Sequence, residues 1–597
     1  MGLKDRAYSL LGFAEKLRPW QEFLPYALLL SVTFAVYGET LYFNFEWDDH
    51  LYIERNLWIR QLSFLHLKAI WTGTFLGHYA PVNLSFLAIL YHFFGLEPFG
   101  YHLAQFLLHA ACVCLLYLTL KELEAPRIAL VASLLFAVHP ANIETVAWIA
   151  EVKSTLAFLF FLLSFLAFIR FRATERGGYA VVCTLFLILS LLAKINTVVA
   201  PAVFLLYDYR QGILFERKKI LSLIGFFLIG VAFVVIHMSS FFWSEHALAK
   251  EALGGAYYGS LWVHLQNIPF FLWFYVRMTF FPYPLTAWHM FPVHAQFGWM
   301  VAGAWIVLLG ACGLLLRRDR NTQFWTLWFV VFLAPVLQIV PNLTWVAERY
   351  LYIPAIGAFV LVGRLFFYVW DRLPRPWLRW SWEGAMIAAL LLLVWRTETY
   401  LPAFQNNLTL WEATAKTCPT SAICHAGLGT ALLEENQIER GMNELIRAVE
   451  IRPTPENLGR LGDAFTLNAR DFRQAIIAYN MALETGGASS ATYSDVELYA
   501  KLARAHLMAG NLEEAGKAVQ AGRAINANDP YLLIVSSFYE SSRGNREAAI
   551  VALRSALSAT GLTSGIPAFI HTYWGNAADV GRLIAYLNNP PPQTAVH

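Results

Sequence analysis

The sequence carries little charge for its length. Only 14% of its 597 residues are Asp, Glu, Lys or Arg, whereas 58% are hydrophobic; soluble globular proteins carry about 25% charged residues. This deficit excludes a cytosolic enzyme and a disordered chain, and a net charge of +3 over such a length excludes a nucleic-acid binder. A single soluble core stops growing at about 250–300 residues. We therefore expect an integral membrane protein with a soluble part attached.

Several motifs of soluble enzymes are also missing. The chain has no glycine-rich phosphate loop, no dinucleotide-binding fingerprint, no zinc spacing of Cys and His, and no Gly-x-Ser-x-Gly turn. Nucleotide chemistry in solution is therefore disfavoured, and a phosphorylated donor carried by a lipid fits better. Four of the six cysteines lie in apolar stretches. The other two, Cys418 and Cys424, can pair if their part of the chain faces an oxidising compartment.

Long runs without a charged residue fill the chain up to about residue 400 and are absent after it. Because a bilayer is crossed by about 20 mostly apolar residues, these runs predict membrane spans. The eleven expected spans are 23–38, 102–120, 128–143, 154–169, 179–193, 197–208, 220–238, 299–316, 323–341, 350–368 and 383–398. The apolar stretches 262–281 and 283–297 fit this count only as re-entrant or interfacial segments.

The positive charges in short loops predict the orientation. Lys4, Arg6, Lys16 and Arg18 precede the first span, so the N-terminus is expected in the cytoplasm. An odd number of spans then places the second part of the chain outside the cytoplasm. The compact loops favour a bacterial inner membrane over the endoplasmic reticulum, so this second part is expected in the periplasm.

The second part of the chain repeats. Leu428-Gly429 recurs as Leu461-Gly462 and again as Leu502-Ala503, and other small residues recur 34 residues apart. This period is that of the tetratricopeptide (TPR) helical hairpin, in which small residues let two helices touch. We expect an all-α protein with a membrane domain over 1–400 and about four TPR units over 401–590. Such a solenoid holds extended peptides, although a passive helical cap remains an alternative.

The first outer loop contains two adjacent acids, Asp48 and Asp49, which follow Trp47. Two neighbouring carboxylates repel each other, so the pKa of one rises unless a cation is close. A carboxylate with a pKa near neutrality can activate a hydroxyl nucleophile. An exposed acidic turn explains the pair equally well at this stage.

Three cations on separate outer loops, Lys153, Lys194 and Arg349, are expected on the same side of the membrane as this acidic pair. Cations at one interface suit a phosphate, which Arg grips with two hydrogen bonds and Lys as a point charge. Snorkelling to lipid headgroups is the alternative for each cation taken alone. The aromatic residues at the same level are either interfacial belt residues or sugar-stacking faces: Trp47, Tyr79, Trp148, Tyr350 and Tyr352.

The order of these motifs resembles a known family. It includes Trp47-Asp48-Asp49, Tyr79-Ala80-Pro81, Gly95-Leu96-Glu97-Pro98-Phe99-Gly100-Tyr101-His102-Leu103, His139-Pro140 with Glu144-Thr145-Val146-Ala147-Trp148-Ile149, Ala347-Glu348-Arg349-Tyr350-Leu351-Tyr352-Ile353-Pro354, and the repeats. The chain resembles the transmembrane-and-TPR-containing O-mannosyltransferases and their bacterial relatives, within the GT-C glycosyltransferase superfamily. The resemblance covers nearly the whole chain. Ala80 departs from it, because family members often have Arg before this proline.

The resemblance implies an inverting transfer of a sugar from a polyprenyl-phosphate donor to an acceptor at the lumenal or periplasmic face. Asp48 would be the general base, with Asp49 as its partner or substitute. Arg349, Lys153 and Lys194 would bind the donor phosphate. The substrate pocket would contain Trp47, Tyr79, His139, Glu144, Trp148, Glu348, Tyr350 and Tyr352. No cofactor is required; two carboxylates allow a divalent metal but do not imply one.

The expected partners are the lipid-linked sugar, membrane lipids, and an acceptor protein whose Ser or Thr hydroxyl is modified while the TPR domain binds it. One alternative keeps the chemistry but makes the acceptor an envelope glycan or a lipid. Another is a non-catalytic scaffold, which the outer acids and cations disfavour. A transporter is disfavoured because carriers keep their ionisable residues near the middle of the membrane.

Overall fold

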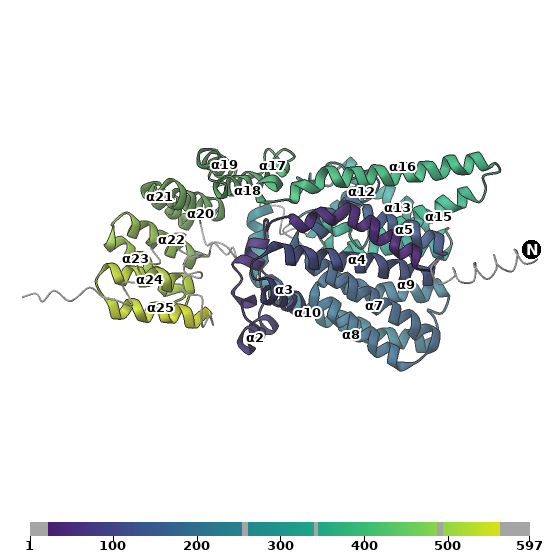
Figure 1. The fold of residues 1–597 in the computed structure, drawn as a ribbon, viewed down its shortest axis with the longest axis horizontal. Coiled ribbons are helices and arrows are strands. Elements are labelled where there is room, and N and C mark those ends of the chain that lie inside the picture. Colours follow the sequence, from purple (N-terminus) through teal and green to yellow (C-terminus); the bar gives the residue numbers. More distant parts are fainter. Residues whose placement is uncertain (1–21, 254–260, 340–343, 486–493, 561–597) are drawn as a thin grey trace, which may run out of the picture. The chain divides into compact units, whose positions relative to one another are not determined.

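A computed structural model describes residues 22–253, 261–339, 344–485 and 494–560 of the chain. Within these residues the regular structure is helical, and extended pairing is limited to one isolated bridge between Phe75 and His78. The all-α fold class predicted from the sequence is thereby confirmed (Figure 1). Membership of the GT-C superfamily stays a prediction.

The chain divides into two units, each of which combines segments that are distant in sequence. The first unit contains Met1–Asp49, Tyr79–Ser239 and Gly259–Thr409, and the second contains His50–His78, Ser240–Tyr258 and Leu410–His597. The second half of the first outer loop, directly after Asp49, therefore belongs with the C-terminal helices. The sequence predicts a single boundary, between one domain over 1–400 and another over 401–590. These bounds stay a prediction.

The first unit starts with a helix over 22–37 that continues as η1 (Gly38–Tyr42). The longer helices that follow are α3 (Pro81–Phe94), α4 (Pro98–Leu123), α5 (Pro126–Val138), α6 (Ile143–Ala147), α7 (Val152–Thr174), α8 (Gly177–Ala193), α9 (Ala200–Gln211), α10 (Arg217–Leu253, which continues into the second unit), α12 (Leu261–Phe280), α13 (Trp299–Leu316), α14 (Arg320–Leu333), α15 (Ala355–Trp370) and α16 (Pro376–Tyr400). Short turns of helix connect them: η4 (Pro140–Asn142), η5 (Ile149–Glu151), η6 (Ile195–Val199), η7 (Ala334–Val336), η8 (Glu348–Leu351) and η9 (Leu401–Phe404). Proline opens α3, α4, α5 and α16, the helix position where its missing N–H has no cost.

Six helices of the described chain are long and apolar enough to cross a bilayer. They are Glu22–Tyr42, Pro98–Leu123, Ile149–Thr174, Arg217–His237, Trp299–Leu316 and Pro376–Phe404. A seventh results if Pro126–Val138 and Pro140–Ala147, which meet at 56°, form one broken span. The protein is thus an integral membrane protein.

The predicted number of eleven spans is not confirmed. The four remaining candidates fall on α8, α9, α14 and α15, which have 17, 12, 14 and 16 residues. A bilayer needs about 20. Lys4, Arg6, Lys16 and Arg18, on which the predicted orientation depends, lie outside the described residues.

Helix α7 lies inside the first unit and places the candidate site. It packs against α4 and α8, while α5 packs against α15. The helix is lined with fully buried aromatic residues, among them Phe158, Phe161 and Phe165. Its first turn carries Lys153, and Glu151 directly precedes it. The charged residues at this end are therefore held by a rigid, closely packed element.

The second unit contains α2 (Phe64–Thr72) and a C-terminal array of helical hairpins. The hairpins are α18 (Ala422–Glu434) with α19 (Ile438–Ile451), α20 (Pro455–Ala464) with α21 (Phe472–Glu484), α22 (Asp495–Met508) with α23 (Leu512–Ile525), and α24 (Pro530–Ser542) with α25 (Arg546–Thr560). They follow α17 (Asn407–Ala415) and form a curved stack (Figure 1). The described part of the repeats thus contains four hairpins.

Small residues hold the first hairpin together. A Cβ atom on Gly429 would lie 2.9 Å from the carbonyl oxygen of Gly441, and one on Gly441 would lie 2.9 Å from the carbonyl oxygen of Gly429. Both distances are shorter than real Cβ contacts, so α18 and α19 touch only because both positions are glycine. Gly429 belongs to the repeated Leu-Gly pair, whereas sequence analysis missed Gly441.

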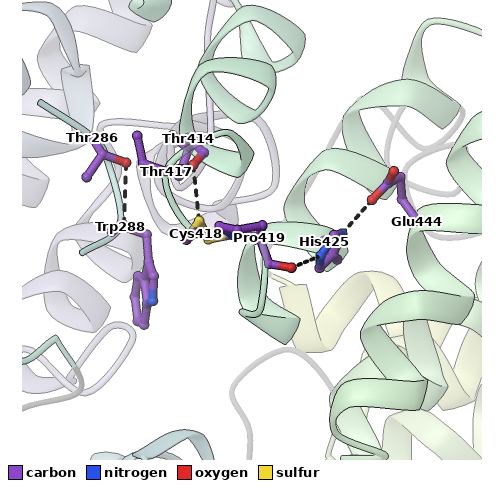
Figure 2. Close-up of a disulfide and its surroundings, with 9 residues drawn as sticks. Thr286, Trp288, Thr414, Thr417, Cys418, Pro419, His425 and Glu444 are labelled. Atoms are coloured by element: carbon purple, nitrogen blue, oxygen red, sulfur yellow. Dashed lines mark hydrogen bonds and ion pairs between the residues drawn. A yellow bond between two sulfur atoms is a disulfide. The ribbon is translucent and has the colours of Figure 1, made fainter. Parts of the chain in front are cut away.

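A disulfide links Cys418 to Cys424 just before and within α18, with Cα atoms 6.4 Å apart (Figure 2). The neighbouring His425 connects this loop to α19. Its Nε2 is 3.0 Å from the carbonyl oxygen of Pro419, and its Nδ1 is 2.6 Å from Glu444 Oε2. The pairing left open by the sequence is thus present, and the other four cysteines are free thiols.

Candidate functional site

The two acids of the first outer loop differ in their surroundings. Asp49 is fully buried; one of its carboxylate oxygens accepts a hydrogen bond from the backbone N–H of Ala150 at 2.6 Å, and the other accepts one from the N–H of Glu46 at 3.3 Å. Asp49 thereby joins the first outer loop to the residues that lead into α7. Asp48 is half-buried. The two neighbouring acids therefore differ in burial, and Asp49 is held by hydrogen bonds from the backbone.

Trp47 lies in the turn that leads into these two acids. Its φ of 48° is left-handed, which is uncommon for a residue with a bulky side chain. The indole ring stacks on Trp148 with a centroid distance of 4.6 Å and an angle of 9°. The Trp47 N–H donates a hydrogen bond to Asn407 Oδ1 at 3.3 Å. Because these contacts hold an unfavourable backbone conformation, the turn is a fixed feature of the site.

Glu46 is a third carboxyl group in the same loop. It is fully buried, and neither of its carboxyl oxygens has a hydrogen-bond partner among the described residues. Burial, together with the nearby charges of Asp49 and Glu144, raises the pKa of Glu46 well above its usual value. Burial therefore disfavours the charged form of Glu46.

The three cations singled out in the sequence meet at one carboxylate, Glu151. Lys194 Nζ lies 2.7 Å from Glu151 Oε2, Lys153 Nζ lies 3.6 Å from Oε1, and Arg349 Nε lies 3.7 Å from Oε1. Ser154 also donates a hydrogen bond to Glu151 and accepts one from Lys194 at 2.7 Å. Sequence analysis missed Glu151 and Ser154 as members of the site.

Arg349 is gripped by a second carboxylate, Glu144. Its guanidinium forms an ion pair with Glu144, and its backbone N–H donates to Glu144 Oε2 at 2.9 Å. The guanidinium also lies over the rings of Trp148 and Tyr350, at 5.4 and 5.1 Å from their centroids. These contacts fix its position relative to the stacked pair of Trp47 and Trp148.

The surroundings shift the pKa of two of these cations. Burial lowers the pKa of Lys194 to about 8, although Glu151 partly opposes the shift. Burial also acts against the charge of Arg349, but Glu144 outweighs it and the pKa of Arg349 is raised. Arg349 is thus a permanent cation, whereas Lys194 can lose its proton in mildly alkaline solution.

A small cavity adjoins these cations. Its polar wall includes Lys194, Arg349 and Ser154, while Phe332, Val336 and Ile353 contribute an apolar wall. Tyr350 and Tyr352 also line it. A cavity with a cationic side and an apolar side suits a ligand that joins an anionic group to a hydrocarbon.

Two other predicted pocket residues, His139 and Glu348, are engaged in the packing of the protein. His139 is buried, with Nε2 at 2.9 Å from the carbonyl oxygen of Thr279 and Nδ1 accepting from the N–H of Ala141 at 3.2 Å. Glu348 accepts from the N–H of Thr286 at 3.0 Å and lies 2.8 Å from His289 Nε2. These contacts position the outer loops around the cavity.

The remaining two predicted pocket residues are placed differently. Tyr352 lies with its hydroxyl 2.8 Å from His109 Nδ1 and lines the cavity. Tyr79 is half-buried just before α3. Among the described residues no group of three or more His, Cys, Asp or Glu side chains is arranged to hold a metal ion.

Comparison with known proteins identifies relatives of one kind. The chain is 22% identical over 479 residues to "Protein O-mannosyl-transferase TMTC3" of Mus musculus, which covers 71% of this chain and 51% of the relative. It is 24% identical over 425 residues to "Protein O-mannosyl-transferase TMTC4" of Homo sapiens, covering 60% of this chain and 56% of the relative. The chain thus spans about half the length of these curated relatives. No protein-family model matches the chain.

Among solved structures, the crystal structure of MamA is 18% identical, covering 26% of this chain and 86% of MamA, with a TM-score of 0.22. A score this low does not establish a shared fold. The resemblance to TMTC proteins inferred from the motifs is therefore supported by sequence similarity, whereas a bacterial origin stays a prediction.

Proposed function

We propose that the protein is a membrane glycosyltransferase that transfers a sugar from a polyprenyl-phosphate donor to Ser or Thr hydroxyls of a protein. The carrying observation is the cavity beside Lys194 and Arg349, because its cationic and apolar walls match the two halves of a lipid phosphate. The names of the similar TMTC proteins give mannose as the sugar and protein as the acceptor. Mannose is therefore the first sugar to test.

In the proposed mechanism the donor phosphate binds Lys194, Lys153 and Arg349. Asp48 removes the proton from the acceptor hydroxyl while the oxygen forms a bond to C1 of the sugar. The bond between C1 and the phosphate oxygen breaks, and the lipid phosphate leaves with its electron pair. Because attack and departure occur on opposite faces, the configuration at C1 inverts. The cations neutralise the leaving phosphate, so no separate general acid is required.

We further propose that the helical repeats hold the acceptor polypeptide, since stacked hairpins of this kind present extended surfaces for peptides. The reaction would take place at the extracytoplasmic face, with the repeats in the periplasm of a bacterial cell. Trp47 and Trp148 would present aromatic faces to the sugar. A chelator added to the transfer assay tests whether the reaction requires a metal ion.

The test is intact-mass and glycan analysis of envelope proteins from cells that lack this protein. The cells are complemented with wild type, with Asp48→Asn, or with Glu435→Gln, a control at an exposed carboxylate of the repeats. We expect a protein to lose a sugar in the deletion strain and to regain it with wild type and Glu435→Gln but not with Asp48→Asn.

Other outcomes would overturn parts of the proposal. If Asp48→Asn complements fully, Asp48 is not the base, and a scaffold function gains weight. If a lipid or polysaccharide changes in mass and no protein does, the transfer chemistry stands and the acceptor is wrong.

A further inference from the structure

Glu151 contacts the three cations of the candidate site, although it does not itself line the cavity. Its side chain is 3% exposed and lies in the short turn η5, directly before α7. Among the described residues, those that line the cavity include Lys194, Arg349 and Ser154, and Glu151 is not one of them. The carboxylate is therefore placed to act on the groups that meet a ligand, and not on the ligand.

The two oxygens of the Glu151 carboxylate hold different segments of the chain. Oε2 is 2.7 Å from Lys194 Nζ, at the end of α8, and accepts a hydrogen bond from Ser154 of α7. Oε1 is 3.6 Å from Lys153 Nζ, also of α7, and 3.7 Å from Arg349 Nε in η8. Ser154 in turn accepts a hydrogen bond from Lys194 at 2.7 Å. One buried carboxylate thus connects three segments that are distant in the sequence.

Lys194 shows what this carboxylate does to a neighbouring cation. Burial has the largest effect on the pKa of Lys194 and lowers it, and the positive charges of Lys153 and Arg349 lower it further. Glu151 acts in the opposite direction, because a negative charge at 2.7 Å favours the protonated amine. Removal of that charge would therefore leave Lys194 neutral over more of the pH range, with two cations still beside it.

We infer that Glu151 is a positioning residue for phosphate binding: it holds the three cations together and charged beside the cavity before a donor enters. The inference rests on the proposed function, because it concerns how that site binds the donor phosphate. The hydrogen bonds of Lys194 leave room for a ligand. A Lys ammonium has three N–H donors, and among the described residues Glu151 and Ser154 accept from Lys194. A third N–H is therefore left for a phosphate oxygen.

The alternative is that Glu151 competes with the phosphate as a counter-ion and is displaced when the donor binds. The burial of its carboxylate disfavours this alternative, since a group that a ligand displaces has to face the ligand. The two interpretations predict opposite effects of removing the charge. Loss of a positioning carboxylate weakens phosphate binding at the pH where Lys194 titrates, whereas loss of a competitor strengthens it at every pH. Tyr350 and Tyr352, which also line the cavity, are uncharged at neutral pH.

Two measurements on the purified full-length protein test this role in Glu151→Gln, Glu151→Asp and Glu175→Gln. The first is trace labelling with acetic anhydride at a series of pH values, in which mass spectrometry gives the pH at which Lys194 is half protonated. The second is the Kd for polyprenyl phosphate in detergent at pH 6 and at pH 8. Glu175, whose side chain is 76% exposed and pairs with Lys219, is the matched control in the same unit.

In Glu151→Gln we expect the pKa of Lys194, about 8 in the wild type, to fall by about one pH unit. At pH 8 the protonated fraction of Lys194 then drops from about one half to about one tenth, so the Kd should rise about fivefold. At pH 6, where Lys194 is protonated in both proteins, the Kd should stay within about twofold of wild type. Glu151→Asp should lie between the two, and it carries the test if Glu151→Gln does not fold.

An unchanged titration of Lys194 in Glu151→Gln would overturn the inference, and so would tighter binding of polyprenyl phosphate by this variant. Glu175→Gln should match wild type in both measurements. If the wild-type protein does not bind polyprenyl phosphate, the proposed function fails, and the inference fails with it. If the wild type binds and only the titration of Lys194 is unchanged, the inference alone fails.

Discussion

Each unit of the molecule contains a cluster of buried charges, and the cluster in the first unit adjoins a cavity. In the first unit, Lys153, Lys194 and Arg349 surround Glu151, with Glu144 as the only other carboxylate that the cations contact among the ion pairs described above. Two of the three cations, Lys194 and Arg349, line a cavity. A ligand that enters this cavity therefore meets positive charge.

In the second unit, Asp463 of α20 is the centre of a network of ion pairs. It receives Lys501 at 2.7 Å and Arg504 at 3.3 Å, both from α22 in the next hairpin, and Tyr479 donates to it at 2.7 Å. Glu497 lies 3.2 Å from Lys501. Burial and ion pairing occur in both clusters, so neither feature identifies a site, whereas the first cluster adjoins a cavity.

The largest expected effect separates the two clusters by activity. Arg349→Met should reduce kcat/KM for sugar transfer by about 10²–10³-fold, because a lost charge-stabilising group in a transfer reaction typically costs this much. Arg504→Met should leave transfer to a short Ser/Thr peptide within twofold. Transfer is measured with purified protein and a polyprenyl-phosphate sugar. Equal loss of activity in both variants would contradict the proposed role of Arg349 in transfer. Arg349→Lys keeps the charge but alters the contacts with Glu144, so it distinguishes these two causes.

The second effect separates the clusters by stability. Asp463→Asn leaves Lys501 and Arg504, which are 10% and 4% exposed, without their central carboxylate. Breaking a buried ion pair on one side costs about 3 kcal/mol. We expect faster hydrogen exchange in α20 and α22 of the detergent-solubilised protein. Glu484→Gln, at an exposed position of α21, is the control and should change nothing.

Acidification provides an independent check on Asp463. Although burial opposes the shift, Lys501 and Arg504 hold the pKa of Asp463 below its usual value. A lowered carboxyl pKa stabilises the fold above the unfolded pKa of about 4, and this stability is lost as pH falls through the folded value. The wild-type repeats should therefore lose stability on acidification, and Asp463→Asn should show less of this loss. Equal acid sensitivity would contradict the assigned role.

The fold of the repeats could be predicted better than that of the membrane part, for a physical reason. Close helix packing requires small residues, so the recurrence of Gly429 and Gly462 reveals the period directly. Hydropathy records whether a segment is apolar and not whether its helix is continuous. The charge-free run 278–316 contains Pro282, Pro284 and Pro292, and its helix starts only at Trp299.

The sequence predicts which residues belong to the candidate site, but not which of their side chains contact each other. The sequence indicates that Lys153, Lys194 and Arg349 lie on one side of the membrane. It cannot indicate that Glu151 joins them, because that contact links residues up to 198 positions apart. Nor can it distinguish Asp48 from Asp49, since their different burial depends on the left-handed turn at Trp47.

A third effect concerns the disulfide between Cys418 and Cys424. Among the described residues, the other cysteines are free thiols. Replacing Cys418 and Cys424 by Ser opens a short loop, which should lower the stability of the adjoining hairpin by about 2 kcal/mol. Hydrogen exchange in α18 with and without dithiothreitol measures the change. Cys312→Ser, at an exposed free thiol of α13, should have no effect. An unchanged exchange rate in reduced protein would show that His425 and its two contacts hold the loop without the disulfide.

The smallest expected effect concerns Lys194 in the cluster around Glu151. With the pKa of Lys194 at about 8, the side chain is protonated below this pH and binds a phosphate as a cation, and it becomes neutral above. KM for the lipid-phosphate donor should therefore rise by about tenfold between pH 7 and pH 9 if binding needs this proton. Lys194→Arg stays charged at pH 9, so KM should rise less in this variant. Lys501→Arg, in the cluster around Asp463, should leave the rise in KM unchanged. A rise that persists in Lys194→Arg would assign the titration to another group and remove Lys194 from phosphate binding, leaving Arg349 and Lys153 as the proposed contacts.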